Sequence, residues 1–502
     1  MSSALRGTYY IQLVSIFILF LGTSNNLFLK SLRVSQVVLP LDTISSHTLP
    51  KQNSDCSTLR VVKKIKHNTT KKQKFHQKKV KKSSMAISRS IKKWTIMIYV
   101  AADNDLNFYA WKNIKQMEKV GSNEQLNIII QVSERGRYKP TQRYIVEKNH
   151  LQKIDFGNKK LNSGSINTLI NFCGWAIKTC PAEHYALILW NHGTGAKEPS
   201  TIKSLNTSEL FVLNPTTNML ELDRSISFFD FISLDHKTEK SHRGICIDES
   251  HHSYISNTEL DYGLNKICKT YLKNKKFDLI GFDACFMQMI EIMNIIQKYA
   301  DIMVGSQEVE LGAGWNYQHI LKLFSQTIPT PEDLAKHIVQ SYQQITSEIT
   351  SDFTLSAINL HQVAKLEENI NQVAALLIHC LEKQQEHSVK DIIKMCKSRR
   401  LCETFDEPSY IDLHNFYTNI LKYIHYFKIS NSSQDLISKL KEKLLDGTKI
   451  IEEIVIANCS GKNLARAQGI SIYFPDIKPH NSYQTLPFAQ NSWFEFLKQY
   501  CL

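Results

Sequence analysis

The chain has 502 residues, of which 42% are apolar and 22% are charged, and its length suits about two or three globular domains. A net charge of +14 would suggest nucleic-acid binding if it were spread over the folded part of the chain. It is instead concentrated in one segment, since fourteen Lys and Arg residues, with no Asp or Glu, lie between Ser57 and Trp94. The rest of the chain is close to neutral and the basic run carries no folded recognition motif, so we expect no nucleic-acid partner. The eleven cysteines include no CxxC pair, which argues against a zinc site and a dense disulfide scaffold.

The first predicted element is an apolar segment near the N-terminus. The run Tyr9–Gly22 follows a positive charge and ends in small residues, so residues 1–24 are predicted to be a signal peptide, with an uncleaved anchor as the alternative. Residues 25–93 follow as a disordered, Lys-rich linker or pro-segment, because dense like charge repels itself. The predicted location is therefore secreted or associated with the cell envelope, with membrane contact only through the N-terminal segment.

From Trp94 onward, apolar strand patterns alternate with amphipathic helical patterns. Buried strands are predicted at Trp94–Val100, Leu126–Glu134, Tyr185–Gly193, Phe277–Cys285 and Asp301–Glu308, with an outer strand at Thr141–Lys148. This alternation predicts an α/β fold with a mostly parallel β-sheet and helices on both faces. Asp103 or Asp105 is predicted to cap the helix that follows the first strand.

The α/β pattern predicts one domain over residues 94–330, interrupted by an insert at 197–242. The insert has no clear period and contains several Lys and Arg residues, which indicates a linker, a lid or a cleavage site. Residues 331–502 are predicted to form a helix-rich C-terminal α/β region, in which Gly469–Pro475 is a candidate to return to the main sheet.

Two of the predicted strands end in chemically reactive residues, His192 and Cys285. Sites in open α/β sheets form at the carboxyl ends of strands, so we expect both side chains at one rim, with the sulfur open to solvent. A cysteine attacks as its thiolate, and a neighbouring histidine can take the thiol proton. The backbone N–H groups of Gly193 and Cys285 are predicted oxyanion donors. The alternative is a structural histidine and a buried, inert cysteine.

The spacing of these residues supports the pair. His192 and Cys285 are 93 residues apart, or 47 when the insert is left out. In caspases the catalytic histidine lies about 50 residues before the nucleophile.

Several motifs in order then add a family resemblance. The stretches WTIMIYVAADNDL, HYALILWNHGTG, RGICIDES, DLIGFDACFMQMIEI, SQEVELGAGWNY, FTLSAINL and AQGISIYFP resemble the clostripain family of cysteine peptidases, which has a caspase-like fold, over roughly Trp94–Pro475. The resemblance implies that His192 is the general base and Cys285 the nucleophile. It also implies that Asp283 lines the pocket for a substrate Arg or Lys, the S1 pocket; the alternative for Asp283 is a helix N-cap.

The chain departs from the family pattern at Ala313, where relatives usually carry an acidic residue before Gly-Trp. Tight Arg selectivity is therefore open, and Glu308 or Glu310 is a candidate substitute. The resemblance further implies activation by self-cleavage, for which the insert and the Lys-rich segment offer basic residues.

No metal site is predicted, and no cofactor is required by the sequence. Calcium is possible by resemblance but unsited; the available oxygen ligands are Asp103, Asp105, Asp248 and Glu249. The expected function is that of a cysteine endopeptidase cutting protein or peptide substrates after Arg or Lys, as a monomer or as two chains after cleavage. The alternative is a catalytically silent caspase-like binding module, held to an anionic surface by the Lys-rich arm.

Overall fold

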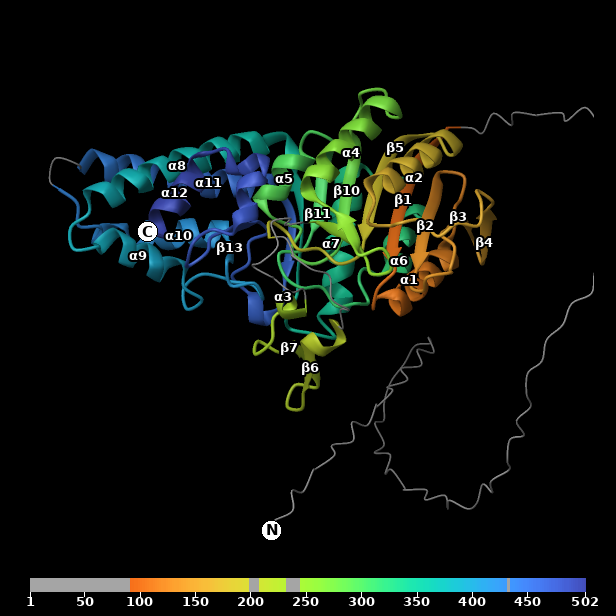
Figure 1. Cartoon of the computed structure of the whole chain (residues 1–502), viewed down its shortest axis with the longest axis horizontal. Coiled ribbons are helices and arrows are strands. Elements are labelled where there is room, and N and C mark those ends of the chain that lie inside the picture. The colour runs from red at the N-terminus through yellow and green to blue at the C-terminus, as the bar shows by residue number, and fades with distance from the viewer. Residues whose placement is uncertain (1–90, 198–206, 232–243, 431–433) are drawn as a thin grey trace, which may run out of the picture. The chain divides into compact units, whose positions relative to one another are not determined.

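The computed structural model describes residues 91–197, 207–231, 244–430 and 434–502, coloured in Figure 1. The predicted signal peptide, residues 25–90 of the Lys-rich segment, and parts of the predicted insert lie outside the described residues. All described residues belong to one compact unit, Ser84–Leu502.

A nine-stranded sheet forms the centre of this unit (Figure 1). Its strands, in spatial order, are β14 (Val455–Ser460), β12 (Thr354–Asn359), β11 (Ala300–Gly305), β10 (Phe277–Asp283), β5 (Ala182–Trp190), β1 (Lys92–Ala102), β2 (Leu126–Glu134), β3 (Gln142–Glu147) and β4 (His150–Ile154). The five central strands, β11 to β2, run parallel. Two antiparallel strands are added at each edge.

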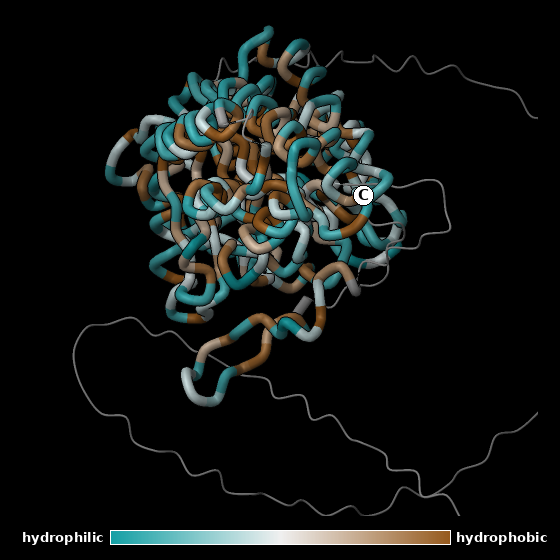
Figure 2. Tube along the Cα trace, turned by 90° about the vertical axis from the view of Figure 1, so that its left-hand side faces the viewer, coloured by the Kyte–Doolittle hydropathy of each residue, from teal (hydrophilic) through white to brown (hydrophobic). Residues whose placement is uncertain are grey.

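The central strands are apolar on both faces because both faces are covered by helices. In β1, Met97 and Tyr99 pack into one core, whereas Ile98 and Val100 pack into the other. The first core is closed by α2 (Ile166–Thr179), α4 (Asn257–Thr270) and α5 (Ile290–Ile296), and the second by α1 (Asn107–Val120), α6 (Tyr317–Lys322) and α7 (Pro331–Thr346). Figure 2 shows the hydrophobic segments gathered inside and hydrophilic ones around them. The predicted helices on both faces are present.

The start of α1 differs from the prediction. Leu106 occupies the N-cap position and makes no side-chain cap. The capping role predicted for Asp103 or Asp105 is wrong, because Asp103 pairs with Lys160 and Asp105 with His192, each at 2.7 Å. Both carboxylates are thus used to connect separate parts of the chain.

The C-terminal region is helix-rich, as its pattern indicates. Its helices are α8 (Val363–Lys383), α9 (Ser388–Lys397), α10 (Leu413–Tyr423), α11 (Gln434–Ile454) and α12 (Ser492–Tyr500). The return of Gly469–Pro475 to the main sheet is wrong: β15 (Ser471–Tyr473) pairs with β13 (Tyr410–Asp412) in a separate two-stranded sheet, and β14 takes the sheet edge. Within the described ranges, no helix combines the length and apolar character needed to cross a membrane.

Two further small sheets lie between β5 and β10 along the chain. The described part of the predicted insert contains the hairpin β6 (Phe211–Asn214) and β7 (Met219–Leu222), then the short helix α3 (Phe228–Phe231). The hairpin projects at the bottom of Figure 1. The other sheet pairs β8 (Ile245–Asp248) with β9 (Ser253–Ile255).

Candidate active site

The strands β5 and β10 are parallel neighbours, and their register decides the position of the two predicted catalytic residues. Trp190 and Asp283 are direct partners at the strand ends, and the Asn191 N–H donates to the Asp283 carbonyl at 3.2 Å. His192 and Cys285 each follow two residues beyond that pair. Both line one small cavity of about 20 Å³. The structure therefore brings the two predicted residues to the same rim of the sheet.

Gly193 allows the chain after His192 to press against the backbone of Cys285. A Cβ atom at Gly193 would lie 2.5 Å from the Cys285 carbonyl oxygen and 2.8 Å from Met287 Cγ. Such distances are well below van der Waals contact, so any larger residue would force the two loops apart. The glycine of the Asn-His-Gly motif is explained by this close approach.

A third residue, Asp105, holds the histidine ring. Asp105 Oδ1 lies 2.7 Å from His192 Nε2, and the His192 side chain is only 2% exposed. Asp105 follows β1, whose strand lies beside β5 in parallel, so its loop reaches the same rim. A proton on Nε2 that is donated to the carboxylate leaves Nδ1 as an acceptor. The sequence interpretation missed this role, although the position of Asp105 just beyond a buried strand was the available signal.

The sulfur of Cys285 is buried, contrary to the expectation that it is open to solvent. The residue is 4% exposed, and its Sγ accepts a hydrogen bond from the Glu310 N–H at 3.3 Å. Burial raises the pKa of the Cys285 thiol, and the nearby carboxyls of Glu310 and Glu308 raise it further. The thiol is therefore protonated at neutral pH in this form of the protein.

Asp283 lies in the same cavity, at the end of β10. Its Oδ2 accepts from the Tyr317 hydroxyl at 2.8 Å and from the Trp315 N–H at 3.2 Å. Burial raises the pKa of Asp283 to about 6, although these hydrogen bonds act in the opposite direction. The alternative role as a helix cap is wrong, because α5 starts only at Ile290.

A second carboxyl, that of Glu310, faces the cavity beside Asp283. Glu310 is 6% exposed, and its two oxygens make no well-formed hydrogen bond with a described residue. Burial and the charge of Asp283 raise the pKa of Glu310 well above its usual value. Of the two candidates for the charge missing at Ala313, Glu310 reaches the cavity, whereas Glu308 pairs with Arg224.

Comparison with known proteins identifies the family. The sequence matches the clostripain family over residues 98–209 and 230–500. The chain belongs to the clostripain family and is a cysteine peptidase. It is 23% identical over 476 residues to clostripain from Hathewaya histolytica, which covers 80% of this chain and 79% of that protein.

Solved structures of similar fold include a secreted C11 cysteine protease from Bacteroides thetaiotaomicron bound to an irreversible peptide inhibitor. It has 15% identity and a TM-score of 0.51, and covers 80% of this chain and 99% of that one. Another structure of a secreted C11 cysteine protease from the same organism has 13% identity and a TM-score of 0.52, with coverages of 81% and 99%. These likenesses confirm the predicted α/β, caspase-like fold.

In this clostripain-family peptidase the insert packs against His192 and against the residue that follows Cys285. Phe228 is fully buried, with its ring centroid 5.9 Å from that of His192 and 5.7 Å from that of Phe286, which follows Cys285. Phe229 packs on Phe286 at 5.8 Å. Residues 210–229 lie between the two ranges that match the family. Phe228 and Phe229, which pack against the site, therefore lie outside the part of the chain that matches the family.

The acidic residues available for calcium have other partners. Asp103 pairs with Lys160, and Glu249 pairs with Arg135 at 3.1 Å. Ligand atoms of Asp103, Asp248 and His251 lie within 4.8 Å of one another. Calcium prefers a shell of oxygen ligands, so an imidazole and a carboxylate already bound to an ammonium group fit it poorly. No calcium site is assigned among the described residues.

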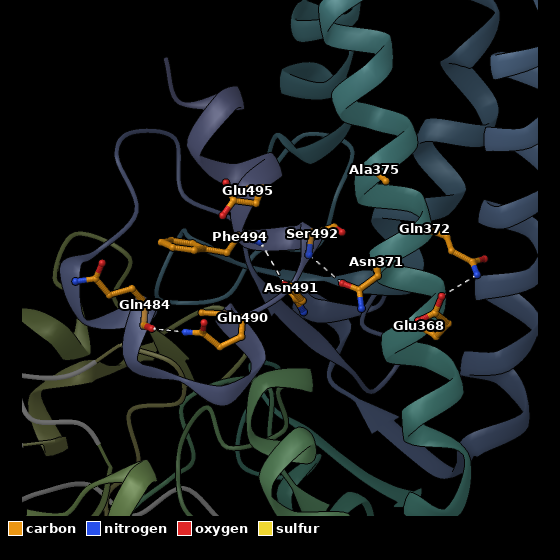
Figure 3. Close-up of a pocket in the computed structure, with 11 residues that line it drawn as sticks. Glu368, Asn371, Gln372, Ala375, Gln484, Gln490, Asn491, Ser492, Phe494 and Glu495 are labelled. Carbon is orange, nitrogen blue, oxygen red and sulfur yellow. Dashed lines mark hydrogen bonds between the residues drawn. The ribbon is translucent and has the colours of Figure 1, made fainter.

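A much larger hollow, of about 950 Å³, lies between α8 and the segment leading into α12 (Figure 3). Its lining is mainly amide and carboxyl side chains, and the Ser492 N–H donates to Asn371 Oδ1 at 3.1 Å. No cysteine or histidine lines this hollow. The small cavity, which combines thiol, imidazole and carboxyls, is the candidate active site.

Proposed function

We propose that this peptidase hydrolyses peptide bonds after Arg or Lys, with Cys285 as nucleophile and His192 as general base. The observation that carries this proposal is the cavity that joins those two side chains to the carboxyls of Asp283 and Glu310. Two buried carboxyls without a cation are unfavourable, and a substrate guanidinium or ammonium group would neutralise them. The cavity therefore suits a basic side chain better than an apolar one.

The proposed reaction assigns one step to each of these groups. Nδ1 of His192 takes the proton from the Cys285 thiol, and the thiolate attacks the carbonyl carbon before the scissile bond. The protonated histidine then gives this proton to the leaving amine, and water hydrolyses the thioester. Asp105 keeps Nε2 protonated and stabilises the imidazolium, which makes it a positioning residue.

The tetrahedral intermediate carries an oxyanion, for which Gly193 and Cys285 offer backbone N–H groups. Gly193 lies against the Cys285 backbone, which supports a shared donor pair. Loss of one such donor typically costs about 3–4 kcal/mol of transition-state stabilisation.

In the described form the Phe228 ring packs against His192, which suits a precursor with restricted access to the site. We therefore also propose that the protein cleaves itself within the insert. Residues 198–206 and 232–243 flank the described part of the insert and contain Lys203, Lys237 and Lys240, but lie outside the described residues. Secretion is also proposed, on the N-terminal sequence and on the secreted proteases of similar fold.

The test compares the wild type with Cys285→Ala on peptides with Arg, Lys or norleucine before the scissile bond. We expect hydrolysis of the basic peptides and self-fragmentation only by the wild type. Equal rates on all three peptides would refute a basic pocket, and identical fragmentation of the two proteins would refute self-cleavage. The alternative of a silent binding module would be supported if Cys285 failed to react with iodoacetamide even after processing.

A further inference from the structure

The insert places one arginine between two buried carboxylates close to the catalytic pair. Arg224 Nη1 lies 3.0 Å from Glu308 Oε2, and its Nη2 lies 3.0 Å from Asp352 Oδ1. The side chain of Glu308 is fully buried and that of Asp352 is 4% exposed, whereas the Arg224 side chain is 24% exposed. The two carboxylates thus belong to the body of the protein, and the guanidinium enters from outside.

Glu308 lies close to Cys285 along the backbone. The Phe286 N–H donates to the Glu308 carbonyl at 3.3 Å, and Glu308 is two residues before Glu310, whose N–H bonds to the sulfur. Four residues after Arg224, the Phe228 ring packs against His192 in a tilted arrangement. The segment from Arg224 to Phe228 therefore connects the acidic pair to His192.

The two carboxylates lie in the part of the chain that matches the clostripain family, and the arginine does not. Glu308 and Asp352 lie within the matched range 230–500, whereas Arg224 lies in the unmatched residues 210–229. Both carboxylates thus lie in the part of the chain that matches the family, whereas the cation between them comes from the unmatched residues of the insert. Departure of the insert would leave the two carboxyls without this cation.

We propose that Glu308 and Asp352 form a second substrate subsite, which binds a basic side chain at a position other than the one before the scissile bond. Arg224 occupies this subsite in the precursor as an intramolecular substrate mimic. The proposal rests on the peptidase function above and adds a second basic determinant to it. A guanidinium is the best fit, because its planar fork bonds to two carboxylates at once.

The remaining bonds of the subsite keep both carboxylates in place when the arginine leaves. Glu308 accepts N–H groups from Val309 and Asp406, at 2.8 and 2.9 Å to its Oε1. Asp352 Oδ2 accepts from the Asn463 amide at 3.0 Å. These are neutral donors, so removal of Arg224 leaves two buried carboxyls in place without a cation. Burial raises the pKa of Glu308 to about 7 even beside Arg224, so this carboxyl takes up a proton more readily once the guanidinium leaves. A cationic peptide side chain would restore the lost charge balance.

The kinetic test uses processed enzyme and peptides with Arg before the scissile bond and a second Arg, or norleucine, scanned through the neighbouring positions. We expect one position at which the second Arg raises kcat/KM by at least about tenfold. Asp352→Asn should remove that gain, while the peptide with a single Arg is cut at an unchanged rate. For Glu308→Gln the gain is measured as the ratio of kcat/KM between the two-arginine and the single-arginine peptide, because Glu308 also acts on the Cys285 thiol. Glu407→Gln, whose carboxylate pairs with Lys197 and not with Arg224, is the matched control.

A binding test does not depend on turnover. The full-length Cys285→Ala protein is given the further substitution Phe228→Ala, which removes the ring that packs on His192. When Arg224→Ala is added, a labelled two-arginine peptide should bind at least about tenfold more tightly than the single-arginine peptide, and Asp352→Asn should abolish this difference. If no second position is preferred and no gain in affinity is measured, the subsite proposal is wrong. The ion pairs of Arg224 would then have only a structural role. Failure of every peptide to be cut, with the affinity gain intact, would instead count against the proposed function.

Discussion

Asp105 Oδ1 lies 2.7 Å from His192 Nε2, so a carboxylate from the loop after β1 orients the histidine at the end of β5. This bond engages Nε2 and leaves Nδ1 as the ring nitrogen that is available to accept a proton. In such catalytic units the orienting acid matters because an amide at the same place favours the wrong tautomer.

Substitution of Asp105 by Asn should therefore lower kcat by about 100-fold, with a KM change of less than about threefold. A second His–Asp pair, between β5 and β10, provides the control: His184 Nδ1 lies 2.6 Å from Asp278 Oδ1 and neither residue lines the cavity. Asp278→Asn should leave kcat unchanged. Equal kcat values for the Asp105 variant and the wild type would remove Asp105 from the mechanism.

Asp283→Asn and Glu310→Gln should each reduce kcat/KM on Arg peptides by about 30-fold or more, with a much smaller effect on a norleucine peptide. The pH dependence has a defined sign. Because the pKa of Asp283 is raised to about 6, the carboxyl is neutral in acid and charged above that value. The preference for Arg over norleucine should rise between pH 5 and 7, and the rise should weaken in Asp283→Asn. A preference that is flat with pH in the wild type would contradict this assignment.

Glu310→Gln should stabilise the precursor in alkaline solution. A carboxyl whose pKa is raised on folding favours the folded state only while it is protonated, so its contribution is lost as pH rises above the unfolded value. In the Cys285→Ala background, we expect the Gln variant to gain about 1–3 kcal/mol in the free energy of unfolding at pH 8 and little at pH 4. Denaturant titrations at both pH values measure this.

The control for that gain is Glu386→Gln, since the Glu386 side chain is 81% exposed. The Glu386→Gln substitution should cause only a small change in the free energy of unfolding, of the same size at pH 4 and pH 8. A loss of stability in Glu310→Gln at pH 8 would mean that the Glu310 carboxylate has a cationic partner after all.

Phe228→Ala should open the precursor. Removal of the ring exposes His192 and lowers the barrier to reaching Cys285, so iodoacetamide should label Cys285 about tenfold faster than in the wild type. Phe172→Ala removes an equally buried ring that packs against Tyr99 and not against His192, and it controls for general destabilisation. Equal acceleration in both variants would show that the effect of Phe228 is not specific.

The sequence was sufficient for the central strands and for the His192–Cys285 pair, because apolar runs and their ends carry that information. β2 has the predicted bounds, Leu126–Glu134. In the folded sheet, the register of the neighbouring parallel strands β5 and β10 then places His192 and Cys285 at the same rim.

The parts that were missed depend on loops and on long-range packing. Asp105 has the sequence signature of a helix cap, and only the neighbouring end of β5 gives it a histidine to bind. Glu310 reaches the cavity through a loop after β11 that has no periodicity to interpret. The packing of Phe228 against His192 depends on a segment that shows no clear pattern in the sequence.

The central claim is that His192 and Cys285 act as one unit at the rim of the sheet. Its most direct test is the rate at which a peptide chloromethyl ketone ending in arginine labels the processed enzyme, followed by mass-spectrometric mapping of the modified residue. We predict labelling at Cys285 that is at least about 100-fold slower in a His192→Ala variant processed by added wild-type enzyme. Equal rates in the two proteins, or modification of another cysteine, would contradict the claim.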